Sequence, residues 1–243
     1  MRLNRYLAHS GVTSRRKADT LISSGAVAIN GKVVRELGTL VTPGKHTVTV
    51  NGKRITEEQK VLYRFFKPAK VVSTISDPEG RPCVGDYLKK SKERLYPIGR
   101  LDFDAFGLLL ITNDGDLADR MMHPKFNIQR TYWAEVLGKV SIESLKRLTS
   151  GVKIDGRHSV AKQAKFLRRT AMVKSLFGNV ERETTFVAIT VVEGRKHFVK
   201  RLFKEIGHPV KHLCRVSFGE HELGSLDPGE MRRVELRTGD EFL

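Results

Sequence analysis

Two carboxylates and an arginine stand directly before one of the most apolar segments of the chain. Arg100, Asp102 and Asp104 precede the run LLLI at residues 108–111. In an extended chain alternate side chains point to the same side, so these three would share one face. An aspartate beside an apolar segment loses hydration, which raises its pKa unless a cation compensates. The pattern fits a carboxylate that works as a nucleophile or a base, or a structural ion pair with Arg100, Lys200 or Arg201 as the cation. The spacing alone favours the ion pair.

The net charge indicates the kind of partner. The 243 residues include 44 Lys and Arg against 27 Asp and Glu, a formal net charge of +17. Such an excess attracts polyanions over long distances. The affinity for nucleic acid increases further because its phosphates release counterions on binding. An anionic membrane is the alternative, but no stretch approaches the roughly 18 apolar residues of a spanning helix. The N-terminus lacks the apolar core of a secretion signal, so we expect a cytosolic protein without a membrane partner. We also expect a monomer.

The sequence offers no recognisable metal site. Cys83 and Cys214 lie far apart and form no metal-spaced pair, and the eight histidines form no H-x-x-x-H motif. We therefore expect two buried, reduced thiols and no metal. A third interpretation of the two aspartates is that the protein is a nuclease in which Asp102 and Asp104 bind a metal ion.

Residues 1–58 read as a separate module. Apolar residues recur at helical spacing on either side of Ser14, which is a plausible N-cap, and Gly25 is expected to end the second helix. Asn-Gly pairs at residues 30–31 and 51–52 lie between alternating apolar residues and predict two tight hairpins. The polar segment at residues 56–60 is the expected linker. The basic residues of the module suit contact with phosphates and include Arg5, Arg15, Arg16, Lys17 and Lys32.

Residues 61–243 mix strands with occasional helices. Strands are expected at residues 61–67, 108–111, 129–138 and 183–194, and helices within residues 77–90, 116–124, 141–151 and 196–210. Runs of strands with few helices between them predict an α+β fold. We expect a catalytic domain built on a mostly antiparallel mixed sheet flanked by helices.

The N-terminal pattern resembles a known RNA-binding module, named after a small-subunit ribosomal protein and also found in tyrosyl-tRNA synthetases. The resemblance covers residues 2–50 and rests on LNRYLAHSGVTSRRKADTLISSGAVAINGKVV. It implies that the segment SRRKA is the helix start that faces RNA.

The segment RLYPIGRLDFDAFGLLLITNDGDLADRMMHP closely resembles the signature of ribosomal RNA pseudouridine synthases that carry this module. Three further segments match in order, namely KPAKVVSTISDPEGRPCVGDYL, QRTYWAEVLG and EGRKHFVKRLFKEIGHPVKHLCRVSFG. The resemblance implies an enzyme that breaks the N-glycosidic bond of a uridine, turns the uracil and joins its C5 to the ribose. It implies no metal or organic cofactor. Large-subunit ribosomal RNA is the favoured target over small-subunit RNA.

The same resemblance assigns roles to five residues. Asp102 is the catalytic carboxylate, and Arg100 enters the RNA near the space left by the extruded nucleotide. Tyr132 lies against the uracil ring, Lys200 pairs with the aspartate, and Leu213 packs beneath the base.

Four positions depart from the family pattern. Ala105 and Phe106 replace the usual Thr, Ser or Glu, Phe198 replaces Gln, and Lys70 replaces Gly. These departures give some support to an alternative function, a non-catalytic RNA-binding or ribosome-assembly factor on the same scaffold.

Overall fold

The computed structural model describes residues 1–178 and 183–235, and the chain divides into two units. The first unit comprises Met1–Val61 with two short pieces, Lys90–Leu95 and Asn113–Gly115. The remaining described residues form the second unit. Within the described part of the chain, no helix is long and apolar enough to cross a membrane.

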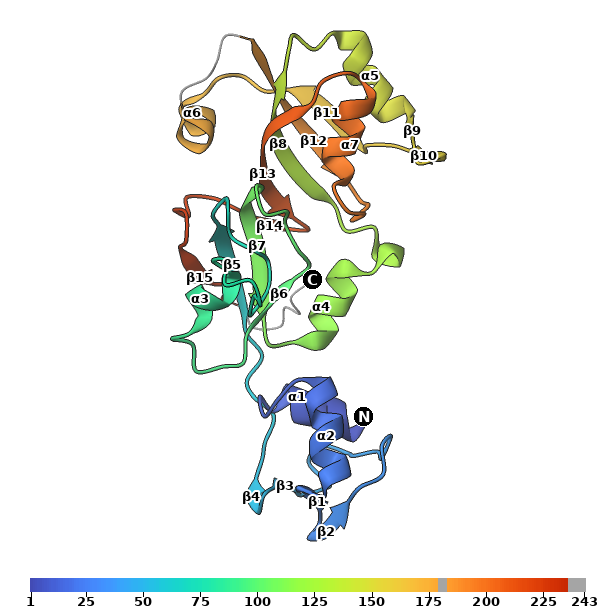
Figure 1. The fold of residues 1–243 in the computed structure, drawn as a ribbon, viewed down its shortest axis with the longest axis vertical. Helices are drawn as coiled ribbons and strands as arrows, with labels where there is room; N and C mark the ends of the chain where they lie inside the picture. Colours follow the sequence, from blue (N-terminus) through green and yellow to red (C-terminus); the bar gives the residue numbers. More distant parts are fainter. Residues whose placement is uncertain (179–182, 236–243) are drawn as a thin grey trace. The chain divides into compact units, whose positions relative to one another are not determined.

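The first unit consists of two helices and a four-stranded antiparallel sheet. Its elements are α1 (Leu3–His9), α2 (Arg15–Ser24), β1 (Val27–Ile29), β2 (Lys32–Val34), β3 (Val48–Val50) and β4 (Lys53–Arg54), with the strand order β2-β1-β3-β4 (Figure 1). The Ser14 side chain accepts a hydrogen bond from the backbone N–H of Lys17, and Gly25 ends α2 in the left-handed region with φ +80°. Both predicted ends of this helix are therefore confirmed.

The two Asn-Gly pairs form the predicted hairpins. Asn30 and Gly31 have φ of 49° and 79°, and Asn51 and Gly52 have φ of 49° and 78°. These positive values match a tight turn whose twist suits the flanking strands. The helices and the sheet enclose a small apolar core made by Leu3, Tyr6, Leu7, Ala18, Ile22, Val27, Val41 and Val48. The expected linker at residues 56–60 has no regular secondary structure.

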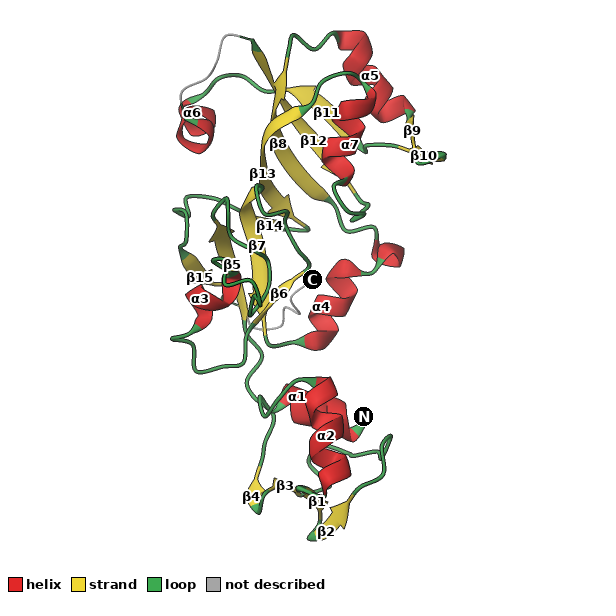
Figure 2. Cartoon of the chain, in the orientation of Figure 1, coloured by secondary structure: helices red, strands yellow, loops and turns green. Residues whose placement is uncertain are grey.

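A long, strongly twisted sheet organises the second unit (Figure 2). Its strands are β5 (Leu62–Lys67), β6 (Tyr96–Ile98), β7 (Phe106–Thr112), β8 (Arg130–Leu137), β11 (Gln163–Phe166), β12 (Thr184–Val191), β13 (Val210–Phe218), β14 (His221–Glu222) and β15 (Met231–Arg233). The main order is β11-β12-β8-β13-β7-β5-β15, with β6 on β7 and β14 on β13. Among the described strands of this sheet only β7 and β13 pair in parallel. The predicted α+β fold with a mostly antiparallel sheet is confirmed.

The helices of the second unit carry apolar faces that complete its core. They are α3 (Val84–Leu88), α4 (Gly115–Met122), α5 (Ile142–Ser150), α6 (Ala171–Phe177) and α7 (Phe198–Glu205), with a 3-10 turn at Pro124–Phe126 and a separate hairpin of β9 (Val152–Ile154) and β10 (Arg157–Ser159). Helix α7 lies within the predicted residues 196–210 and buries Phe198, Val199, Leu202 and Phe203, whose spacing places them on one face of the helix.

The parallel contact between β7 and β13 requires a glycine. Gly107 pairs with Arg215 across this contact and has φ +100°. A Cβ atom at residue 107 would overlap the backbone carbonyl oxygen of Arg215 and approach the Cys214 sulfur to 2.8 Å. Only a residue without a side chain lets the two strands meet here.

The substitution Gly107→Ala should therefore destabilise the second unit strongly. It combines the cost of a positive φ with a backbone clash, so we expect a loss of roughly 3 kcal/mol in the free energy of unfolding. Gly156→Ala is a matched control, because Gly156 has φ +75° but nothing lies within 4 Å of an added Cβ. The control should lose roughly 1 kcal/mol. Urea unfolding curves measure both, and equal losses would contradict the role given to the strand contact.

Candidate active site

One cavity in the second unit gathers the five residues singled out in the sequence. Its volume is about 840 Å³, and its walls include Arg100, Asp102, Tyr132, Lys200 and Leu213. Small-molecule sites in proteins span roughly 300–1,000 Å³, so the cavity is large enough for one nucleoside. The lining contains six arginines and lysines against two carboxylates, which makes the cavity strongly cationic.

Asp102 lies in the loop that joins β6 to β7. Residues 101–105 form no strand, and the backbone carbonyl of Asp102 accepts a hydrogen bond from the N–H of Ala105 at 3.1 Å, closing a turn. The segment is therefore not extended, and the condition under which Arg100, Asp102 and Asp104 would share one face is not met. The turn reverses the chain just before β7 begins, so the spacing of alternate residues does not apply to this segment.

The loop that carries Asp102 is tied to a neighbouring loop on both sides of the aspartate. The Ser73 hydroxyl donates to the carbonyl of Leu101 at 2.8 Å and accepts from its N–H at 3.0 Å. The N–H of Lys70 donates to the carbonyl of Phe103 at 2.6 Å. With the backbone fixed before and after it, Asp102 is held in place before any substrate arrives.

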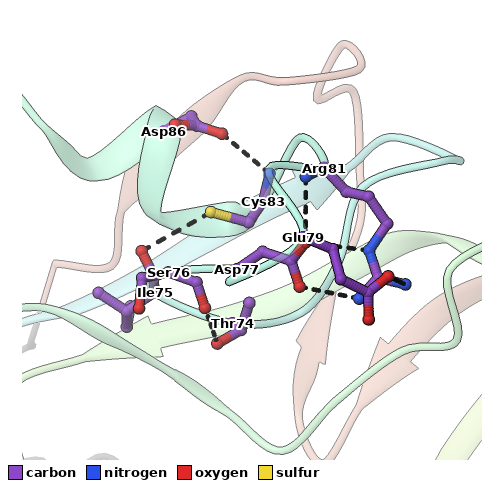
Figure 3. Close-up of polar contacts among 8 residues, drawn as sticks. All are labelled: Thr74, Ile75, Ser76, Asp77, Glu79, Arg81, Cys83 and Asp86. Atoms are coloured by element: carbon purple, nitrogen blue, oxygen red, sulfur yellow. Dashed lines mark hydrogen bonds and ion pairs between the residues drawn. The ribbon is translucent and has the colours of Figure 1, made fainter.

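The neighbouring loop, residues 68–83, is itself held by a polar network (Figure 3). Asp77 bonds the Arg81 guanidinium through both oxygens, at 2.8 and 3.0 Å, and the Cys83 thiol donates to the carbonyl of Ile75 at 3.6 Å. Gly85 lies so close to that carbonyl that no side chain fits. This rigid loop contributes residues 72–75 to the cavity wall.

The sheet supplies the floor of the cavity. Arg215 on β13 pairs with Tyr132 on β8, and Leu213 pairs with Ala134 two residues along. Paired residues of neighbouring strands point to the same face, and residues two apart on a strand do so as well. Tyr132, Leu213 and Arg215 therefore line the cavity together.

Lys200 contacts both carboxylates. It donates to the two oxygens of Asp104 at 2.6 Å and lies 3.9 Å from Asp102, while the His197 ring nitrogen Nε2 lies 3.5 Å from Asp102. Partial burial acts to raise the pKa of Asp104, but the hydrogen bond and charge of Lys200 outweigh it and hold the pKa below its ordinary value. The expected pairing of Lys200 with Asp102 alone is thus incomplete, since the shorter contacts go to Asp104.

A second lysine lies fully buried near these groups. Lys67 ends β5, and its ammonium donates to the carbonyls of Pro68 and Val71 at 2.8 Å each. Burial lowers the pKa of Lys67 to about 8, against the opposing charges of Asp104 and Asp102. The Lys67 ammonium therefore loses its proton at a lower pH than an ordinary lysine does.

Sequence reasoning missed Arg215. It is 2% exposed, and its Nε donates to the carbonyl of Leu108 at 2.8 Å. Its guanidinium carbon lies 4.9 Å from the centre of the Phe218 ring, and its Nη2 has no hydrogen-bond partner among the described residues. The sequence did hold one signal for Arg215. It lies two residues after Leu213, and side chains two residues apart share one face of a strand. His197 carried no comparable signal, since only the fold brings it to Asp102.

The departures from the family pattern have different surroundings. Lys70 has φ +61°, a left-handed conformation that explains why glycine is usual there. Ala105 and Phe198 are buried and line the cavity, and Arg195 lies 4.7 Å above the Phe198 ring. Phe106 packs in the main core.

The basic residues predicted in the first unit lie on its two helices and one hairpin. Arg5 is on α1 and half-buried, while Arg15, Arg16 and Lys17 form the first turn of α2 and are exposed, and Lys32 begins β2 and is also exposed. The first turn of α2 contains no acidic residue. Three cations at the positive end of a helix dipole repel it, and an anion bound there would relieve the repulsion.

Both cysteines are buried and free. Burial raises the pKa of the Cys214 thiol. Within residues 1–178 and 183–235, no cluster of three His, Cys, Asp or Glu side chains could hold a metal ion.

Comparison with known proteins agrees with this geometry. A model of RNA pseudouridylate synthases matches residues 62–205, which is more than half of the chain. The chain belongs to the RNA pseudouridylate synthase family. A model of the S4 domain matches residues 1–46. The chain is therefore an RNA pseudouridine synthase with an N-terminal S4 domain, which confirms the enzyme class and the module expected from the sequence.

Curated relatives resemble this synthase over nearly its whole length. "Ribosomal large subunit pseudouridine synthase B" of Bacillus subtilis is 41% identical over 233 residues, covering 96% of this chain and 91% of the relative. An uncharacterised RNA pseudouridine synthase of Aquifex aeolicus is 38% identical and covers 99% and 92%. A crystal structure described as a pseudouridylate synthase matches with a TM-score of 0.64 and 26% identity, covering 97% of this chain and 96% of that one.

The buried Lys67 predicts a particular dependence of stability on pH. In the unfolded chain its pKa is 10.5, and in the folded synthase it is about 8. Between these values the unfolded state binds more protons, so stability rises with pH from about 8 to 10.5 and the penalty for the buried charge is fully present below 8. The buried charge of Lys67 lowers the free energy of unfolding by at most roughly 3 kcal/mol.

Lys67→Met removes the titrating group and should flatten this rise. Urea unfolding at a series of pH values measures the difference in stability between the wild type and the variant. We expect that difference to shift in favour of the wild type as the pH increases through the window. Parallel curves for the two proteins would show that Lys67 titrates normally in the folded state.

Proposed function

We propose that this synthase converts a uridine of ribosomal RNA to pseudouridine, with large-subunit RNA as the favoured target and Asp102 as the catalytic carboxylate. The observation that carries the proposal is Asp102 on its tied loop, in a cationic cavity with Tyr132 and Leu213. The name of the Bacillus subtilis relative supports ribosomal RNA of the large subunit. The cytosol is the proposed compartment, because ribosomal RNA is the proposed substrate.

The target uridine must leave the RNA stack before any side chain can reach it. Extrusion costs a few kcal/mol, and groups that hold the extruded nucleotide or fill the gap offset that cost. Arg100 is exposed where it lines the cavity, so it is positioned to enter the gap and hold neighbouring phosphates. Leu213 is buried, and Tyr132 is half-buried on the same sheet face, so both suit contact with a flat ring.

Asp102 has the surroundings of a reactive anion. Its side chain is 27% exposed, and the His197 ring and the Lys200 ammonium lie 3.5 and 3.9 Å away, so its carboxylate lies beside polar and cationic groups in a site partly shielded from water. As an anion it can attack the nucleoside or remove a proton from the ribose, and both roles use the same oxygen atoms. The N1–C1′ bond breaks and a C5–C1′ bond forms, while C5 loses a proton and N1 gains one. These changes balance without an oxidant or a group donor.

Exchange of Asp102 for asparagine tests this assignment. Asp102→Asn keeps the size of the side chain and removes its charge, so formation of pseudouridine should fall about 10³-fold. The RNA affinity should stay nearly constant. The reaction is followed by the loss of tritium from C5 of labelled uridine in ribosomal RNA.

Asp104→Asn is the matched control, because it lies two residues away and shares Lys200. This variant should keep most of its turnover. If the Asp102 variant turned over at the wild-type rate, or if only the Asp104 variant lost activity, the assignment would be wrong.

We further propose that residues 1–58 form an RNA-binding domain and residues 61–243 a catalytic domain. Arg5, Arg15, Arg16, Lys17 and Lys32 are the proposed phosphate contacts of the first. The three cations in the first turn of α2 support this proposal, since without a bound anion they only repel the helix dipole.

Removal of the three cations Arg15, Arg16 and Lys17 by alanine substitution should weaken RNA binding and make it less salt-dependent. Each lost phosphate contact reduces the slope of log affinity against log salt by about 0.7 to 0.9, so the triple variant should lose about 2 to 3. Filter binding at several salt concentrations measures the slope. Alanine at Lys146, Lys153 and Arg157, all exposed and outside the cavity wall, removes equal charge as a control. Equal changes in slope for both triple variants would show that net charge alone causes the effect, and the proposed phosphate contacts of α2 would be wrong.

A further inference from the structure

Three large apolar side chains are exposed at the wall of the catalytic cavity. Ile75 is 48% exposed, Phe103 is 45% exposed and Met122 is 44% exposed, and all three line the cavity. They come from three separate segments, namely the rigid loop 68–83, the loop that carries Asp102, and the end of α4. We call this set the apolar rim. Exposed apolar side chains that gather at a concave site indicate contact with a ligand rather than chance exposure.

The backbone on which the rim stands is fixed. The carbonyl of Ile75 accepts a hydrogen bond from the Cys83 thiol in the polar network of Figure 3. The carbonyl of Phe103 accepts from the N–H of Lys70 at 2.6 Å. The Met122 sulfur would lie 3.7 Å from a Cβ atom built on Gly99, so this side chain rests against the start of the Arg100 loop. A surface that is ordered in advance loses little entropy when a ligand binds.

The charge around the rim indicates which kind of ligand would contact these apolar side chains. Arg100, Arg195, Lys196 and Lys200 line the same cavity, so the partner is an anion that also presents flat apolar surfaces. RNA with unstacked bases has both properties. When one nucleotide is extruded, the bases on either side lose a stacking partner and expose a face.

We propose that the apolar rim binds the nucleobases that flank the extruded uridine, with Phe103 stacking on one of them. This inference rests on the proposed function, because it takes an extruded uridine as its starting point. Every base has an aromatic face, so the rim recognises unstacked bases with little regard to their identity. It favours target uridines whose neighbours are free to unstack, such as those in loops and bulges.

A cycle of protein and RNA changes tests the contact. The substrate is a fragment of ribosomal RNA whose uridine the wild type converts, made also with an abasic ribose on the 5′ or the 3′ side of that uridine. A stacking contact contributes roughly tenfold in affinity, so Phe103→Ala should lower kcat/KM about tenfold on the intact fragment. On the fragment that lacks the partner base, the same substitution should cause almost no further loss, because residues in contact are not additive. Phe103→Leu keeps an apolar side chain and should give an intermediate value.

Two other variants separate the contact from damage to the Asp102 loop. Ile75→Ala leaves the backbone carbonyl and its bond to Cys83 in place, and it should show the same coupling to an abasic neighbour with a smaller loss. Phe166→Ala is the matched control, because Phe166 is 43% exposed but lies on β11 outside the cavity wall. It should not couple to either abasic position.

The outcomes are distinct. If Phe103→Ala lowered kcat/KM by the same factor on intact and abasic fragments, or did not lower it on any of them, the proposal that the rim binds flanking bases would be wrong. The proposed function of the enzyme would stand. If the wild type released no tritium from any ribosomal RNA fragment, the proposed function and this inference would both be rejected.

Discussion

The close approach of β13 to β7 is the constraint on which the catalytic cavity depends. These strands pair in parallel at Gly107 and Arg215, and the pairing needs a residue without a side chain at that position. β7 begins directly after the loop of Asp102, whereas β13 supplies Leu213 and Arg215 to the floor of the cavity. More than a hundred residues separate the two segments in the chain. One backbone contact therefore brings the carboxylate and the floor of the site together.

The same region holds more positive charge than its carboxylates can neutralise. Lys67 and Arg215 are almost completely buried, and their hydrogen bonds go to backbone carbonyls rather than to acids. A buried cation without a counterion raises the free energy of the empty site. The charges of Asp102 and Asp104 offset part of this cost, as does the approach of a polyanion. The excess of positive charge therefore favours a polyanion such as RNA as the occupant.

Local features of this chain were readable from the sequence, while contacts made by the fold were not. The Asn-Gly hairpins and the Ser14 cap depend on a few adjacent residues, so they were predicted correctly. The cavity residues came from a resemblance, and the structure brings all five to one cavity. The turn at residues 102–105 escaped prediction because alternate spacing in a short polar segment does not distinguish a strand from a turn. The double contact of Lys200 and the burial of Arg215 depend on partners about a hundred residues away, and the sequence indicates only that Arg215 shares a strand face with Leu213.

Charge and shape act at different stages of RNA binding. Contacts from surface cations to phosphates are available whether the target uridine is stacked or extruded, so they increase affinity without favouring the reactive form. Contacts that exist only after extrusion lower the barrier, because they are absent from the ground state. In the proposed site, Tyr132 and Leu213 would meet only a base that has left the stack. The apolar rim would extend this selection to the neighbouring bases, which become accessible at the same moment. An enzyme that reads the unstacked state in this way gains specificity from the deformability of its RNA target as well as from its sequence.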